Sequence, residues 1–429
     1  MAEALARAAY ALLLRLATPV YLLRLWWRGR REPGYRAHLG ERLGFFDGQP
    51  EPGRLWLHAV SLGETRAAVP LIDALRRQHP GLKLLLTHGT ATGREAGRAL
   101  LREGDAQAWL PYDTPGAVRR FLRRHRPCAG VVMETEIWPN LMAAAQAQGV
   151  TLVLANARLS ERSRRKGQRL RALMHPALAR FRQVLAQTEG DAARLRASGA
   201  PAVQVLGNLK YDMTPRPELL ARGKAWRGAL GRPVVLAAVT REGEELPLLR
   251  AFAERVAGQP RPPLLLLVPR HPQRFDEVAA LMAAAGFPPA RRSTWADTPD
   301  AAALQAAAWL GDTLGEMPLY YACADVALLG GSFAPLGGQN LIEAAACGCP
   351  LVMGPHTFNF ADAAELSIAA GAAERVPDIE AGVTCAWAIA AEAGTEAHRQ
   401  RAERALAFAA EHRGAAERMA AAVLALAAR

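Results

Sequence analysis

The chain has little of several features that point to particular classes of protein. Aromatic residues make up only 6% of its 429 residues, and they do not alternate with basic residues as on RNA-binding surfaces. Its five cysteines are an odd number for so long a chain, which argues against a disulfide framework and for a reducing compartment. The sequence contains neither an Asp-x-Asp motif nor a Walker-type phosphate loop. These absences disfavour a nucleic-acid binder, a disulfide-rich secreted protein and a P-loop enzyme.

Positive charge, in contrast, is abundant. The formal net charge is +13, and much of the excess is arginine, which suits the recognition of phosphates and carboxylates. Hydrophobic residues make up 51% and charged residues 22%, a normal balance for a globular protein. A chain of this length is expected to form two domains. The composition therefore predicts a folded two-domain protein that binds anionic lipid or phosphorylated ligands.

The N-terminal segment 4–27 is strongly apolar and is followed by the basic cluster Arg28-Gly29-Arg30-Arg31. Arginines within the segment (Arg7, Arg15 and Arg24) make a central membrane span costly. We therefore favour a helix that lies in the membrane interface over a single span or an ordinary packed helix. Either membrane arrangement puts the rest of the chain in the cytoplasm, so residues 1–31 are predicted to anchor the protein to the cytoplasmic face of a membrane.

After the anchor, short apolar runs alternate with helical patterns, which is typical of a parallel sheet covered on both faces. The alternation pauses at the Pro-rich stretch 212–217 and then starts again. We expect an α/β protein with two Rossmann-like domains, 32–213 and 214–429, with a ligand cleft between them and a last helix able to return to the first domain. The expected strands are 55–60, 82–87, 131–133, 152–154, 234–236, 264–268 and 326–329; the expected early helices are 65–79 and 91–102.

Acidic residues follow two expected strands of the first domain. Glu64 ends the run His58–Glu64, at the start of a helix, where it is placed either to act as a general base or only to interact with the helix dipole. Glu134 and Glu136 follow the strand at 131–133 and could bind substrate hydroxyls, orient basic side chains or cap a helix. The basic run 156–166 is either a solvated face or a contact for an anionic lipid.

Glycines and one arginine follow expected strands of the second domain. Arg270 lies between prolines after the strand at 264–268, where it is well placed to bind a phosphate. The glycine-containing runs 311–316, 330–332 and 337–343 would let a phosphate approach the backbone, and Glu343 could accept hydrogen bonds from a ribose. If the leaving group is a nucleoside monophosphate, it contains no diphosphate for a metal to bridge, so no metal is expected. We expect Cys347 and Cys349 to be buried rather than metal ligands.

Taken together, these segments resemble the Kdo transferases, which transfer 3-deoxy-D-manno-octulosonate (Kdo) from CMP-Kdo to the lipid A precursor. The resemblance covers nearly the whole chain, in the same order, and the combination of runs is specific although no single run is. The matching runs are His58–Glu64, Met133–Asn140, Asn156–Ser163, Gly207–Asp212, Pro269–Pro272, Gly311–Met317, Gly330–Ser332, Gly337–Glu343 and Met353–Phe360.

The resemblance implies an inverting GT-B glycosyltransferase that needs no metal or other cofactor, with CMP-Kdo as donor and the lipid A precursor (lipid IVA) as acceptor. It implies that Glu64 is the catalytic base and that Glu134 and Lys210 support the transition state. It further implies a set of CMP contacts: Pro269, Arg270, Leu314, Gly315, Glu316, Asn340, Leu341, Ile342 and Glu343.

Three positions depart from the usual pattern of the family. Arg241 and Gln339 each stand where a histidine is usual, and Asn208 replaces a common serine. All three keep a side chain that forms hydrogen bonds, so the departures bear on donor contacts and pH response rather than on the reaction. Two alternatives remain open on the sequence: a GT-B transferase or epimerase that uses a UDP-sugar, and a non-catalytic scaffold that binds membrane lipid.

Overall fold

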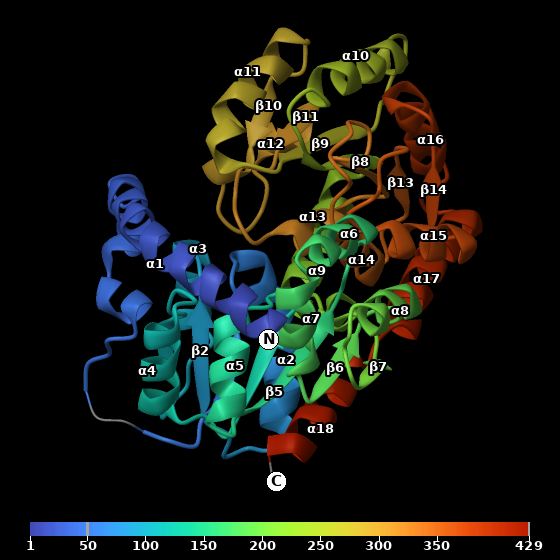
Figure 1. Cartoon of the computed structure of the whole chain (residues 1–429). Coiled ribbons are helices and arrows are strands. Elements are labelled where there is room, and N and C mark those ends of the chain that lie inside the picture. Colours follow the sequence, from blue (N-terminus) through green and yellow to red (C-terminus); the bar gives the residue numbers. More distant parts are fainter. Residues whose placement is uncertain (49–50, 428–429) are drawn as a thin grey trace. The chain divides into compact units, whose positions relative to one another are not determined.

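The computed structural model describes residues 1–48 and 51–427. These residues form two compact units, each built on one seven-stranded sheet (Figure 1). The first unit comprises Met1–Met213 together with Arg413–Arg429, and the second comprises Thr214–His412. The two sheets agree with the expected alternation of strands and helices, so the predicted α/β architecture with two Rossmann-like units is confirmed.

All strand pairs in the sheet of the first unit are parallel, in the order β3-β2-β1-β4-β5-β6-β7. The order runs outward in both directions from β1, as in a Rossmann fold. The strands are β1 (Leu55–His58), β2 (Leu84–His88), β3 (Ala106–Trp109), β4 (Ala129–Met133), β5 (Thr151–Ala157), β6 (Gln183–Ala186) and β7 (Val203–Val205).

Helices cover both faces of this sheet (Figure 1). Alternating residues of β1 separate the two cores: Trp56 packs on one face, and Leu55 and Leu57 pack on the other. The face of Trp56 is covered by α4 (Pro115–His125), α5 (Pro139–Ala147), α7 (Arg171–Ala179) and α8 (Glu189–Ala197). The opposite face is covered by α2 (Leu62–Gln78) and α18 (Ala415–Ala427). The shorter elements are α3 (Ala91–Arg98), α6 (Glu161–Arg169), and the 3-10 turns η1 (Pro33–Arg36), η2 (Leu39–Leu43) and η3 (Leu209–Asp212).

The N-terminal helix α1 (Ala2–Arg28) is the single helix in the described part of the chain that is long and apolar enough to cross a membrane. Only 6% of its most apolar stretch is buried within the protein, so leucines such as Leu12, Leu13 and Leu16 remain exposed. The helix contacts α5 and α7, and Glu3 forms an ion pair with Arg180. A helix with an apolar exposed surface fits the predicted anchor, and its attachment to a membrane stays a prediction.

The sheet of the second unit is also parallel, in the order β10-β11-β9-β8-β12-β13-β14. Its strands are β8 (Val234–Thr240), β9 (Leu264–Pro269), β10 (Pro289–Arg291), β11 (Ala308–Leu310), β12 (Val326–Leu329), β13 (Leu351–Met353) and β14 (Ala373–Arg375). Its helical elements are α9 (Pro217–Leu230), α10 (Glu245–Val256), η4 (Pro272–Arg274), α11 (Phe275–Ala284), η5 (Arg292–Thr294), α12 (Ala301–Gln305), α13 (Met317–Cys323), α14 (Leu341–Ala346), α15 (Ala361–Ala369), α16 (Ile379–Ala391) and α17 (Glu396–Glu411).

One face of the second sheet packs against α10, α11 and α16, with Phe252 among the fully buried side chains. On the other face, Trp226 of α9 meets Trp309 of β11 edge-on, with ring centroids 5.9 Å apart. Of the two cysteines flanking Gly348, Cys349 is buried and Cys347 is half-buried, close to the expectation. The core thus occupies both faces of the sheet and leaves its ends for loops.

The last helix of the chain belongs to the first unit. Helix α18 packs against α2, where Met419 joins the core of the first sheet. The carboxylate of Asp212 accepts hydrogen bonds from the backbone N–H groups of Gly414 and Ala416, at the start of this helix. The second unit is therefore inserted into the first, and the Pro-rich stretch 212–217 is the outgoing connection.

Candidate active site

Glu64 lies at the carboxyl edge of the first sheet, in the first turn of α2. Its carboxylate accepts a hydrogen bond from the Val60 backbone N–H (2.8 Å), and the Ser61 hydroxyl lies 3.4 Å from its other oxygen. The Ser61 hydroxyl in turn accepts from the Glu64 backbone N–H (3.3 Å). This is close to a capping box with Ser61 as the N-cap, except that the Glu64 carboxylate binds the N–H of Val60, one residue before the N-cap. Glu64 therefore lies at the start of a helix, as expected, and these hydrogen bonds fix how its carboxylate is oriented.

The environment of Glu64 suits a proton acceptor. Burial raises the pKa of Glu64 to about 7, and the negative charges of Glu134 and Glu136 add to the rise. The Val60 N–H and the Ser61 hydroxyl limit the shift because they stabilise the charged form. A carboxylate with a pKa near neutrality can accept a proton in one step and return it in another.

Glu134 follows β4 in a strained backbone conformation. Its φ of +57° lies in the left-handed region that non-glycine residues seldom adopt, while its N–H still donates to the Ala155 carbonyl (2.9 Å). The side chain is buried, and its carboxylate accepts from Arg158 Nε at 2.9 Å. Strain of this kind clusters at functional sites, because the fold must hold a side chain where the relaxed backbone would not.

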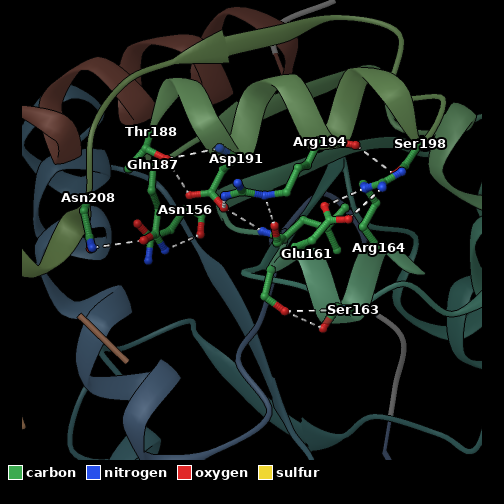
Figure 2. Close-up of polar contacts among 12 residues, drawn as sticks. Asn156, Glu161, Ser163, Arg164, Gln187, Thr188, Asp191, Arg194, Ser198 and Asn208 are labelled. Atoms are coloured by element: carbon green, nitrogen blue, oxygen red, sulfur yellow. Dashed lines mark hydrogen bonds and ion pairs between the residues drawn. The ribbon is translucent and has the colours of Figure 1, made fainter. Parts of the chain in front are cut away.

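Lys210 lies near this acidic group. Burial lowers the pKa of Lys210, and the charge of Glu134 opposes that shift. The turn η3 that carries Lys210 is positioned by Asn156, whose side-chain oxygen accepts from the Leu209 N–H (3.1 Å). Figure 2 shows the rest of this arrangement: Gln187 donates to the Asn156 carbonyl (2.9 Å) and accepts from Asn208 (3.0 Å). The charge of Glu134 thus acts on both Glu64 and Lys210, and the catalytic roles of the three residues stay predictions.

His58, although it opens the same sequence run, has a different environment. It is fully buried, its Nδ1 lies 2.9 Å from the Thr87 hydroxyl, and burial together with the nearby His88 lowers its pKa to about 3. An imidazole that stays neutral at physiological pH and has no access to solvent supports the sheet rather than the chemistry.

The corresponding edge of the second sheet is basic. Arg270 follows β9 and is exposed, with its N–H donating to the Thr240 carbonyl at 2.9 Å. Desolvation lowers the pKa of His271, and the positive charges of Arg241, Arg270 and Arg274 lower it further. Arg274 is held in ion pairs with Glu245 (2.7 Å) and Glu277 (2.8 Å), so it is chiefly Arg241 and Arg270 that make this edge attractive to an anion. Pro269 is the last residue of β9, so it sets the position of Arg270, which follows it directly.

The buried carboxylate of Glu244 joins two loops at this edge. One oxygen accepts from the N–H groups of Arg241 (2.9 Å) and Gly331 (2.8 Å), and the other accepts from those of Phe333 (3.2 Å) and Ala334 (3.1 Å). The loop after β8 and the loop after β12 are therefore held together by four hydrogen bonds to one charged side chain. Glu244 supports the anion-attracting edge without being an exposed part of it, being only 4% exposed.

Two glycines are required in the second of these loops. A Cβ on Gly330 would lie 2.3 Å from the Val239 carbonyl oxygen, a clash with backbone that cannot be relieved by a side-chain movement. Gly331 adopts a φ of +70°, and a Cβ there would lie 3.2 Å from Gln339 Nε2 and 3.5 Å from Arg241 Cγ. Arg241 and Gln339, the two residues that stand where the family usually has histidines, therefore both lie next to Gly331.

The run Leu314–Glu316 places its side chains in different environments. Leu314 is 75% exposed, and Gly315 adopts a φ of +81°. Glu316 is held by ion pairs with Arg222 and with Arg292 (3.0 Å). Burial favours the neutral form of Glu316, but the hydrogen bonds from Thr313 and Arg292 outweigh it and lower the pKa. Its carboxylate is therefore occupied internally, which leaves the backbone of this run to contact a ligand.

The run 340–343 begins α14. Asn340 caps the helix through the Ile342 N–H (3.3 Å). The side chains of Leu341 and Ile342 are 1% exposed, so only their backbone can meet a ligand, while Glu343 is half-buried. The two sets of predicted residues thus fall within separate units: Glu64, Glu134 and Lys210 in the first, and the nine predicted donor contacts in the second.

The sequence analysis missed some residues that organise these edges. Arg158 was treated as part of a basic run, whereas it forms an ion pair with Glu134. Asn156, near the end of β5, and Glu244, just before α10, were not singled out, because only the folded structure shows that these polar side chains are buried. In residues 1–48 and 51–427, no group of three or more His, Cys, Asp or Glu side chains is arranged to hold a metal ion, and independence from metal stays a prediction.

Comparisons with known proteins identify the relatives of this chain. The family model described as 3-deoxy-D-manno-octulosonic-acid transferase (kdotransferase) matches residues 37–213. The chain is 50% identical to a 3-deoxy-D-manno-octulosonic acid transferase of Bordetella pertussis, over 96% of this chain and 97% of that protein. It is 36% identical to the protein of the same name from Haemophilus influenzae, over 82% of this chain and 83% of that one.

Among solved structures, the Anabaena protein HepE in complex with UDP has a similar fold, with a TM-score of 0.59 over 87% of this chain and 99% of HepE. At 15% sequence identity this likeness concerns the fold alone, which is the GT-B arrangement of two parallel α/β domains. Because half of its residues are identical to one Kdo transferase over nearly the full length of both proteins, the chain belongs to the Kdo transferase family of glycosyltransferases.

Proposed function

We propose that this protein transfers Kdo from CMP-Kdo to a glucosamine hydroxyl of the lipid A precursor (lipid IVA), with Glu64 as the general base. The names of the relatives from Bordetella pertussis and Haemophilus influenzae support Kdo as the transferred sugar, and the lipid acceptor makes lipopolysaccharide biosynthesis the process that we propose. Membership of an enzyme family also removes the non-catalytic scaffold as an alternative.

The observation that carries the assignment of the base is the carboxylate of Glu64, which is oriented by the Val60 N–H and has a pKa raised to about 7 by burial. At neutral pH about half of the molecules hold this carboxylate ionised and ready to accept a proton. Glu64 removes the proton from the acceptor hydroxyl as the oxygen of that hydroxyl attacks the anomeric carbon of Kdo. A new glycosidic C–O bond forms, and the bond between that carbon and the phosphate oxygen of CMP breaks.

Charged residues of each unit support this proposed reaction. Positive charge that develops on the anomeric carbon is favoured by carboxylates such as Glu134, while Lys210 is placed to balance them. The phosphate of CMP leaves with negative charge, which Arg270 and the neighbouring Arg241 stabilise. The backbone of the runs 314–316 and 340–343 contacts the nucleotide, and no metal takes part.

We further place the protein at the cytoplasmic face of the inner membrane. Helix α1 has the length and exposed apolar surface of an interfacial anchor, and the basic cluster Arg28–Arg31 follows it. The net charge of +13 favours the surface of an anionic membrane. This location brings the enzyme to its lipid acceptor.

The test is incubation of the full chain with CMP-Kdo and tetraacylated lipid A precursor, followed by mass spectrometry of the lipid. The expected product is heavier by one or more Kdo residues, with an equal release of CMP. A parallel measurement compares the melting temperature in CMP and in UDP, and only CMP is expected to raise it. A lipid of unchanged mass, or stabilisation by UDP alone, would contradict the proposal and favour a transferase or epimerase that uses a UDP-sugar.

A further inference from the structure

The first unit contains a cavity of about 680 Å³ beside Glu134. It is enclosed by the residues that follow β4, the end of β5, and the helices α6, α7 and α8. Its volume is within the range of ~300–1,000 Å³ that is typical of small-molecule sites. Neither the proposed base nor the donor contacts use this space.

The inner wall and the rim of the cavity differ in chemistry. Three fully buried leucines of the sheet core (Leu154, Leu178 and Leu195) form the wall together with the half-buried Met174. Leu170, which is 58% exposed, adds an apolar surface between α6 and α7. The rim carries four basic side chains, Arg158, Arg164, Lys166 and Arg171. Arg158 is paired with Glu134 and Arg164 with Glu161, whereas Lys166 and Arg171 are exposed. An apolar interior behind a basic rim is complementary to an amphiphile with an anionic head group.

Hydrogen bonds hold the wall of the cavity in place (Figure 2). The carboxylate of Asp191 accepts from the backbone N–H of Leu159, a residue of the wall, at 2.9 Å. Arg194 donates to the Leu159 carbonyl and forms an ion pair with Asp191 (2.9 Å). Arg164 on the rim is oriented by two hydrogen bonds to Glu161, at 2.7 and 2.8 Å. A cavity braced in this way is formed before a ligand arrives.

The cavity also lies close to the apolar N-terminal helix. Helix α7, which contributes Arg171, Met174 and Leu178 to the cavity, also contacts α1. Arg180, which follows α7, forms an ion pair with Glu3 at the start of α1. A lipid that contacts α1 would therefore be separated from the cavity by α7 alone, because α7 contacts α1 and also lines the cavity.

We propose that this cavity receives one acyl chain of the phosphorylated glycolipid acceptor, and that its basic rim binds a phosphate of the same molecule. The inference rests on the proposed function, because it concerns the acceptor of that reaction. With its chain in the cavity, the sugar end of the acceptor lies toward Glu134, which is part of the cavity lining. The cavity thereby selects acylated acceptors over the bare disaccharide.

Binding of dodecyl phosphate, kept below its micelle concentration, tests the cavity directly by titration calorimetry. Dodecanol and inorganic phosphate, measured separately, report on the apolar wall and on the basic rim. Met174→Trp fills the cavity from α7, and Ala197→Trp fills it from an exposed position on α8, where folding is not at risk. Ala193→Trp, an exposed alanine of α8 that does not line the cavity, is the matched control. Both filling variants are expected to weaken binding by about tenfold or more, and the control is not.

The same variants are then assayed with CMP-Kdo and two acceptors, the tetraacylated lipid and its fully deacylated disaccharide bisphosphate. Filling the cavity is expected to raise the KM for the acylated acceptor by about tenfold and to leave transfer to the deacylated one unchanged. Wild-type binding of dodecyl phosphate no tighter than inorganic phosphate, or equal losses on both acceptors, would overturn the inference. Absence of Kdo transfer by the wild type, with dodecyl phosphate binding as expected, would instead refute the proposed function and leave the cavity assignment intact.

Discussion

The two sheets have closely related strand orders, yet their carboxyl edges have opposite charge. At the first edge, burial raises the pKa of Glu64 and of Glu136, and the negative charge of Glu134 adds to both shifts. At the second, Arg241, Arg270 and Arg274 act together on His271. The parallel α/β frame therefore supplies position only, and the residues after each strand decide the charge of its edge.

The two edges also differ in how the backbone is shaped. At the first edge, Glu134 and Asn156 adopt positive φ angles of 57° and 52° although they are not glycines. At the second, glycines such as Gly331 and Gly338 take most such positions, and Val239 (φ +59°) is the exception, at an irregularity between β8 and β9. A strained backbone is kept where a polar side chain is needed, and glycines, which adopt these φ angles without strain, are used where we expect a ligand to approach the backbone.

Glu64→Gln is expected to produce the largest effect, because it removes the proposed proton acceptor of the first edge. The amide oxygen can still accept from the Val60 N–H, so the start of α2 should be preserved. We expect kcat to fall by about 10²–10⁴-fold, the usual contribution of a general base. Stabilisation by CMP, read as a shift of Tm, should remain as in the wild type. Near-normal transfer by a folded variant would remove Glu64 from the mechanism.

Arg270→Ala tests the second edge and should act on the donor instead. Loss of one charge-assisted hydrogen bond costs about 1.5–3 kcal/mol, so KM for CMP-Kdo should rise by about 10–150-fold. Arg250→Ala, which removes an exposed arginine from α10, is the matched control. Equal losses in the two variants would mean that net charge, rather than a specific contact, attracts the donor.

Glu244→Gln asks whether the second edge depends on a buried charge. The new amide group can accept through one oxygen only, so at least one of the four backbone N–H groups should lose its partner. We expect the free energy of unfolding to fall by about 1–3 kcal/mol, with a lower Tm and weaker CMP binding. The neighbouring Glu242→Gln, at an exposed position, should leave both unchanged. A loss of stability without any loss of CMP binding would separate the loops from donor recognition.

Glu134→Gln should lower kcat through the lost transition-state charge, and its smallest effect, a displaced pH profile of kcat/KM, reports on the coupling to Glu64. Burial is the main reason that the pKa of Glu64 is about 7, and the charge of Glu134 raises it further. Activity should therefore rise with pH through about 7 in the wild type, as Glu64 loses its proton. Removing the charge of Glu134 lowers that pKa, so the rise should occur at lower pH. A profile displaced to higher pH would contradict the coupling between the two carboxylates.

Much of the fold was predictable because buried parallel strands are written as continuous apolar runs. The strand predicted at 326–329 matches β12 residue for residue, and β9 extends the prediction by one residue, to Pro269. Short edge strands such as β7 and β10 were not predicted, since none of their residues is fully buried and no apolar run marks them. The helix predicted over 91–102 ends at Arg98 instead, after which the Asp105 carboxylate accepts from the Arg102 N–H.

The candidate site was predictable to a similar depth. An apolar strand followed by an acidic or basic residue indicates the carboxyl edge of a parallel sheet, and Glu64 and Arg270 were predicted from this pattern. What the sequence could not reveal was the partner of each charge: Arg158 for Glu134, or the two loops held by Glu244. These partners are 24 and about 90 residues apart along the chain, so only the folded topology brings them together. The pKa of Glu64 depends on burial and on such neighbours, and it is likewise a property of the fold.

The return of α18 to the first unit has a consequence for the order of events during synthesis. Residues 415–427 leave the ribosome after the whole second unit has been made, so the second unit can fold while the first still lacks a helix. Until then, the apolar side chains beneath Met419 are open to water and to other nascent chains. A chain interrupted near its end would thus keep a finished second unit and a first unit that lacks one of its covering helices.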